Sequence, residues 1–264
     1  SGGRGMGMAH LDVNFYSEAL GMATGMQVLL PEELPRARAR TLYLLHGMSD
    51  DESTWTRRTS IERYAAGRGL AVVMPFGGLG WYTDMHRGPK WFSFLTEELP
   101  AKCRALFPML SDRREDTFAA GLSMGGYGAL KCGLRAGKVF SRVASLSGAL
   151  DAYDCALNGR GLAPQAFWED VFGPAEGIPG SRNDLFRAAE EMRDSEFRPD
   201  VYMWCGTEDF LYYQNIRMRD HLRRLGYSPT YGESAGDHQW LYWDRWIQDV
   251  LDWLVPGEEG NPWR

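Results

Sequence analysis

The chain has 264 residues, of which 44% are hydrophobic and 13% aromatic, and its formal net charge is −6. This length and composition are typical of one folded domain with a substantial core and exclude global disorder. The sequence has no basic tract, and no apolar run reaches the roughly 18 residues of a membrane span. We therefore expect neither nucleic acid nor a membrane as a partner.

The two ends and the cysteines add further expectations. Residues 1–10 lack the apolar core of a secretory signal and are expected to be an expression-vector remnant or a loose N-terminus. Residues 257–264 are expected to form a loose tail, which leaves a domain at residues 11–256. The four cysteines have neither metal-site nor disulfide spacing, which favours reduced thiols, no metal and a cytoplasmic location.

Short apolar runs alternate with segments of helical periodicity along the chain. Strands are predicted within residues 15–30 (an opening pair) and at 41–46, 70–75, 118–120, 142–146, 201–205 and 230–233. Helices are predicted at residues 60–68, 91–107 (with a kink at Pro100), 163–171, 184–193, 213–225 and 240–254, and after residue 123. This alternation predicts an α/β fold with a mostly parallel twisted sheet and helices on both faces.

Two segments without a core strand are candidates for the wall of a substrate pocket. Residues 151–199 are expected to form a short lid-like insertion, in which Phe167 and Trp168 are pocket candidates. Residues 76–89 form a long loop at the end of a predicted strand, where open α/β sheets bind ligands. Within this loop, Trp81 and Tyr82 are expected either to line the pocket or to pack beneath the loop.

The stretch Gly121-Leu122-Ser123-Met124-Gly125 matches G-x-S-x-G between a predicted strand and a predicted helix. So sharp a turn strains the central serine and leaves no room for side chains two positions away on either side. A phosphate loop is the competing interpretation. It is disfavoured because Tyr127-Gly128 stand where Lys and Ser/Thr belong. Ser123 is therefore the predicted nucleophile.

A serine nucleophile needs a base and an orienting acid, which follow it along the chain in the order acid, then histidine. Of five histidines, His238 alone follows Ser123 in a loop before the last predicted helix. His221 also follows it, but lies within a predicted helix among arginines and is expected to face solvent. The remaining histidines, which precede Ser123, are His10, His46 and His86. His46 is expected to brace its loop and His86 to lie at the surface.

The orienting acid is predicted to be Asp209, which follows the strand at residues 201–205 after a Gly-Thr turn. Its neighbour Glu208 is expected to point away, and Asp237 lies too close to His238 along the chain to reach the far nitrogen of its ring. The oxyanion hole is predicted to be formed by the backbone N–H groups of Met124 and Met48, the latter in the loop after the strand at residues 41–46.

Several longer stretches resemble one family: FYSEALGM, YLLHGMSDDESTW, WYTDM, GLSMGGYGALK, GTEDFLY and GDHQW. Together they resemble the tributyrin-esterase branch of the esterase D-like α/β-hydrolases. The resemblance implies an α/β-hydrolase fold and a cofactor-free serine carboxylesterase that acts on short-chain acyl or aryl esters as a homodimer or homotetramer. It places the family's nucleophile, acid, base and oxyanion residues on Ser123, Asp209, His238, Met48 and Met124. Trp240, which closes the last stretch, joins the pocket candidates.

The resemblance leaves the substrate open, because S-formylglutathione hydrolases, feruloyl esterases, acetyl-xylan esterases and mycolyltransferases are relatives. Tyr127 counts against the first group, in which histidine is usual at that position. A catalytically silent binding protein on the same fold is the alternative from outside enzymology.

Overall fold

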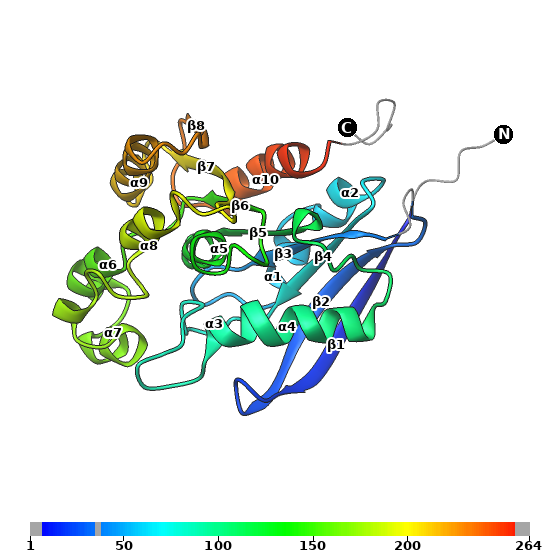
Figure 1. Ribbon diagram of the computed structural model, residues 1–264, viewed down its shortest axis with the longest axis horizontal. Helices are drawn as coiled ribbons and strands as arrows, with labels where there is room; N and C mark the ends of the chain where they lie inside the picture. The colour runs from blue at the N-terminus through cyan, green and yellow to red at the C-terminus, as the bar shows by residue number, and fades with distance from the viewer. Residues whose placement is uncertain (1–6, 35–37, 257–264) are drawn as a thin grey trace.

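The computed structural model describes residues 7–34 and 38–256, which form one eight-stranded sheet with helices on both faces (Figure 1). The strands follow the spatial order β1-β2-β4-β3-β5-β6-β7-β8. Pairing is antiparallel between β1 and β2 and between β2 and β4, and parallel elsewhere. The strands are β1 (Met8–Ser17), β2 (Met22–Pro31), β3 (Arg40–Leu45), β4 (Leu70–Pro75), β5 (Thr117–Leu122), β6 (Arg142–Leu146), β7 (Asp200–Gly206) and β8 (Thr230–Ser234). The predicted fold class is confirmed.

The ten α-helices of the described residues divide between the two faces of the sheet (Figure 1). They are α1 (Thr54–Arg58), α2 (Ile61–Ala65), α3 (Trp91–Ser93), α4 (Leu99–Leu106), α5 (Met124–Arg135), α6 (Ala152–Asn158), α7 (Gln165–Phe172), α8 (Leu185–Met192), α9 (Tyr212–Arg224) and α10 (Trp240–Leu254). Helices α1, α2 and α10 share one apolar core with the sheet, and the others pack into the second core. None of the described helices is long and apolar enough to cross a membrane.

The central strand β3 shows why its sequence is a continuous apolar run. Leu42 and Leu44 pack into the core beneath α1, α2 and α10, whereas Tyr43 and Leu45 pack into the opposite core with α5. All four side chains are buried, because successive residues of a strand point to opposite faces and both faces are covered. The sheet therefore holds the carboxyl-terminal ends of the central strands β3 and β5 rigidly, and the candidate site lies at these ends.

Several elements differ from their predicted limits. Strand β1 begins at Met8, so residues 8–10 belong to the sheet and are not loose; residues 1–6 and 257–264 lie outside the described residues. A π-helical segment, Phe94–Glu98, separates α3 from α4. The helical backbone is continuous from Trp91 to Leu106, and the π-helical segment directly precedes Pro100, whose nitrogen cannot donate a hydrogen bond within a helix. Residues 151–199 contribute α6, α7 and α8, of which α6 was not predicted.

Candidate active site

Ser123 lies on a sharp turn between β5 and α5 and has a strained backbone conformation with positive φ, φ 53° and ψ −119°. A Cβ atom built on Gly121 would lie 2.4 Å from the carbonyl oxygen of Gly125. A Cβ atom built on Gly125 would lie 2.4 Å from the carbonyl oxygen of Leu45 in β3. Because these neighbours are backbone atoms of packed elements, both positions require glycine. The strand–turn–helix context predicted for the motif is present.

The structure brings Ser123, His238 and Asp209 together in one hydrogen-bonded row. The Nε2 atom of His238 lies 2.9 Å from Ser123 Oγ, and its Nδ1 atom lies 2.8 Å from Asp209 Oδ2. The Asp209 side chain is fully buried, and its other oxygen, Oδ1, accepts a hydrogen bond from the Leu211 N–H at 2.8 Å. This second bond fixes the carboxylate, which in turn orients the imidazole toward Ser123.

The two competing carboxylates are engaged elsewhere. Glu208 Oε2 accepts a hydrogen bond from the Gly236 N–H at 2.5 Å, and Asp237 Oδ2 accepts one from the Gln239 side chain at 2.7 Å. Each carboxylate thus supports the loop that carries His238 rather than its ring. Both arrangements agree with the expectation that neither is the orienting acid.

The other histidines have structural contacts or lie at the surface. His46 Nε2 accepts a hydrogen bond from the Gly77 N–H at 2.8 Å, and burial lowers its pKa to about 4, so the ring braces the loop as a neutral acceptor. His86 is exposed, as predicted. The expectation that His221 faces solvent is wrong: its side chain is 13% exposed, and its Nε2 lies 3.0 Å from the Phe186 carbonyl oxygen on α8.

Two backbone amides lie beside the nucleophile. Met124 is the first residue of α5, and the first N–H groups of a helix have no acceptor within the helix. Met48 belongs to the loop after β3, and a Cβ atom built on its neighbour Gly47 would lie 3.7 Å from Ser123 Cβ. The positive end of the α5 dipole adds to the attraction for an anion at this position. These two amides are the candidate oxyanion donors.

Ser123 and His238 open into a cavity of about 340 Å³ with a mainly apolar wall. The lining residues are Gly47, Met48, Asp50, Trp81, Leu122, Ser123, Ala149, Cys155, Leu162, Phe210, Leu211, His238, Trp240 and Trp243. Neither Asp50 nor Phe210 was predicted to be part of this wall. Each lies within two residues of a predicted site residue, Met48 and Asp209 respectively, and that proximity was the available signal.

Of the five aromatic residues predicted for the pocket, Trp81 and Trp240 line the cavity and the other three do not. Tyr82 is buried beneath the loop, where its hydroxyl donates to the His46 carbonyl oxygen at 3.0 Å. Trp168 is buried behind Trp81, with ring centroids 5.2 Å apart. Phe167 packs against Trp168 with ring centroids 5.1 Å apart. Tyr82 thus occupies one of its two expected positions, beneath the loop. The prediction was wrong for Phe167 and Trp168, because these rings support the wall from behind.

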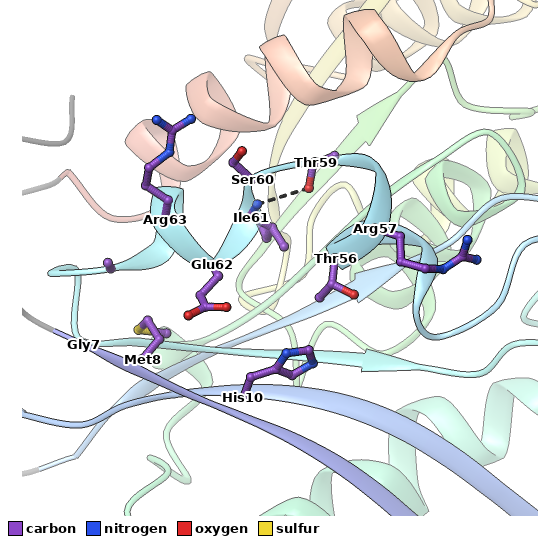
Figure 2. Close-up of a pocket in the computed structure, with 11 residues that line it drawn as sticks. Gly7, Met8, His10, Thr56, Arg57, Thr59, Ser60, Ile61, Glu62 and Arg63 are labelled. Carbon is purple, nitrogen blue, oxygen red and sulfur yellow. Dashed lines mark hydrogen bonds between the residues drawn. The ribbon is translucent and has the colours of Figure 1, made fainter.

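A larger cavity of about 780 Å³ lies elsewhere, between β1 and the α1–α2 segment (Figure 2). His10 lies on its strand side and Ser60 on its helical side (Figure 2). The His10 ring is hydrogen-bonded to Gln27 at 3.1 Å, and Ser60 forms no side-chain cap for α2. The described residues around this cavity therefore lack the nucleophile–base–acid arrangement of the smaller cavity.

Known proteins resemble this chain over most of its length. A family model described as "Putative esterase" matches residues 17–254. The acetyl esterase of Caldicellulosiruptor saccharolyticus is 31% identical over 94% of this chain and 98% of its own. Two solved structures from Staphylococcus aureus match 94% of this chain, and each match covers 98% of the chain in that structure. The fluorophosphonate-binding serine hydrolase F has a TM-score of 0.86 at 32% identity, and an S-formylglutathione hydrolase has a TM-score of 0.83 at 33% identity.

Proposed function

The chain belongs to the esterase family, and from that premise we propose that it is a serine carboxylesterase with Ser123, His238 and Asp209 as its catalytic triad. The observation that carries this proposal is the continuous row of hydrogen bonds, 2.9 Å and 2.8 Å long, that ends at the catalytic cavity. A serine hydroxyl is a weak nucleophile at neutral pH, and such a row supplies its activation.

In the proposed reaction, His238 Nε2 accepts the Ser123 hydroxyl proton as Oγ attacks the ester carbonyl. Asp209 holds the Nδ1–H and stabilises the imidazolium that forms. The Met48 and Met124 amides donate to the oxyanion, at about 3 kcal/mol each in comparable sites. His238 then gives its proton to the leaving alcohol. Water, activated by the same imidazole, hydrolyses the acyl-Ser123 intermediate and restores the hydroxyl.

The size of the cavity favours small substrates. Ligand pockets of proteins have volumes of about 300–1,000 Å³, and this cavity of about 340 Å³ lies near the lower limit. Its mainly apolar wall suits a short acyl chain or an aryl group. We therefore propose short-chain acyl or aryl esters as substrates, with no cofactor. The proposal extends to a cytoplasmic homodimer or homotetramer with neither nucleic acid nor membrane as a partner.

The direct test replaces the nucleophile. Ser123→Ala should lower the kcat for p-nitrophenyl butyrate at least a thousandfold and abolish labelling by a fluorophosphonate probe, because both depend on the activated hydroxyl. The wild-type enzyme should release a burst of p-nitrophenol when deacylation is the slower step. Ser228→Ala removes an exposed hydroxyl and is the matched control, with full activity expected. Retention of turnover by Ser123→Ala would refute the assignment.

Three alternatives have different outcomes in substrate and labelling assays. The similarity to an S-formylglutathione hydrolase at 33% identity favours a thioesterase as the second candidate, and a feruloyl or acetyl-xylan esterase is a third. A panel of thioesters, feruloyl esters and acetylated sugars would separate them by kcat/KM. A catalytically silent binding protein would give neither labelling nor a burst.

A further inference from the structure

Asp50 brings a carboxylate to the wall of the catalytic cavity, beside the candidate oxyanion hole. Its Oδ2 atom lies 3.3 Å from the Gly47 nitrogen, which donates a hydrogen bond to it. A Cβ atom built on Gly47 would lie 3.3 Å from this oxygen and 3.7 Å from Ser123 Cβ. The carboxylate and the nucleophile therefore flank the same point of the loop.

The charge of Asp50 is only partly compensated. Within residues 7–34 and 38–256, no lysine or arginine forms an ion pair with it within 4.0 Å, and Arg57 and Arg58 act only from a greater distance. Its neighbour Asp51 is occupied by Ser53 and Thr54. Burial raises the pKa of Asp50, while the Gly47 hydrogen bond opposes this shift. The half-buried Asp50 side chain stands beside an otherwise mainly apolar cavity.

A negative charge at this position is unfavourable for the proposed chemistry itself. Negative charge develops on the carbonyl oxygen of the ester in the transition state, and a nearby carboxylate raises the energy of that state. The loop needs an acceptor for the Gly47 amide, but a neutral serine or asparagine would provide one. The position of this carboxylate therefore points to selection among substrates rather than to acceleration of the reaction.

We propose that Asp50 is a specificity residue that makes the enzyme discriminate against anionic esters and favour neutral or cationic ones. This inference rests on the proposed function. It also bears on the second candidate: a glutathione thioester carries two carboxylates and one ammonium group, so its net charge is −1. Such a substrate is disfavoured in this cavity relative to an uncharged ester of the same acyl group.

The test uses three acetate esters that share one acyl group and differ in the charge of the leaving group. They are methyl 4-acetoxybenzoate (neutral), 4-acetoxybenzoate (anionic) and 4-acetoxy-N,N,N-trimethylanilinium (cationic). Comparing each ester's kcat/KM between wild type and Asp50→Asn cancels its intrinsic reactivity. Asparagine keeps the shape of the side chain and an acceptor for Gly47. Two unit charges about 7 Å apart near a protein surface change a rate constant roughly 5- to 20-fold after screening.

Asp50→Asn should therefore raise the anionic-to-neutral ratio of kcat/KM about tenfold and lower the cationic-to-neutral ratio by a similar factor. Asp12→Asn, which removes one exposed carboxylate from the edge strand β1, is the matched control and should change neither ratio. Unchanged ratios in Asp50→Asn, or equal changes in both variants, would overturn the proposal. If Asp50→Asn does not fold, Asp50→Ser provides the same comparison.

The two proposals fail in different ways. If Ser123→Ala hydrolyses the neutral ester as fast as wild type, the triad is refuted. If hydrolysis depends on Ser123 but the charge ratios do not depend on Asp50, only the specificity inference is refuted.

Discussion

At Gly125 the turn leaves no space for a side chain, since an added Cβ would meet the Leu45 carbonyl oxygen at 2.4 Å. We expect Gly125→Ala to displace the start of α5 from β3 and to lower kcat for p-nitrophenyl butyrate at least a hundredfold, because a displacement of about 1 Å at a catalytic group already has an effect of this size. Gly177→Ala is the matched control: no atom lies within 4 Å of its added Cβ, and full activity is expected. Wild-type activity in Gly125→Ala would show that the turn tolerates a Cβ.

Single residues also show which features of the site could be predicted from the sequence. The spacing of glycines around Ser123 reflects a local steric requirement, so the nucleophile could be predicted from the sequence. The order of residues along the chain then identified His238 and Asp209 as the partners of Ser123. Trp168 was misplaced and the position of Tyr82 was left open, because aromatic content does not determine which side of a loop a ring occupies. That choice depends on contacts between segments far apart in the sequence.

At the scale of elements, prediction was best where both ends of an element carry a local signal. Strand β4, strand β6 and helix α10 have their predicted limits. Strand β1 was mostly missed, although Ala9, Leu11, Val13 and Phe15 alternate along it and pack on the second core. Helix α6 was also missed, although Asp151 precedes it and its side chain accepts the Asp154 N–H at the helix start. The alternation in β1 and the Asp151 cap before α6 are weak signals, since neither segment is a continuous apolar run.

Two aliphatic residues of helix α10 lie in opposite environments. Leu241 is 71% exposed, whereas Ile247 is fully buried in the core that α10 shares with the sheet. Ile247→Ala should lower the free energy of unfolding by about 3 kcal/mol, through lost burial and a new cavity. Leu241→Ala is the control within the same helix and should change that free energy by less than about 0.5 kcal/mol. Urea denaturation measures both values, and equal losses would contradict the observed orientation of the helix.

The attachment of residues 151–199 is also an element-scale feature. Lys131 on α5 is fully buried and donates to Asn183 Oδ1 at 2.7 Å, and burial lowers its pKa to about 7. One helical turn earlier, the Tyr127 hydroxyl donates to the Asn183 carbonyl oxygen at 2.9 Å. The helix that begins at Ser123 thus also anchors this segment. Its role as a lid remains a prediction.

At the scale of the whole molecule, the four cysteines are all free and buried. Burial raises the pKa of Cys103 and of Cys155 to about 12, and it raises those of Cys132 and Cys205 still further above the ordinary thiol value. Since the thiolate is the reactive form, the native protein should resist thiol reagents near pH 8.

We expect an aromatic disulfide reagent to titrate none of the four thiols in the native enzyme and all four after denaturation in guanidinium chloride. A reducing agent should leave the melting temperature unchanged, because the structure contains no disulfide bond among its cysteines. Cys155 makes this test informative about the site, since it lies in the wall of the catalytic cavity yet is only 7% exposed. Rapid modification of one thiol with loss of esterase activity would mean that this wall opens in solution. Such an opening would contradict the small cavity volume on which the proposed preference for small substrates depends.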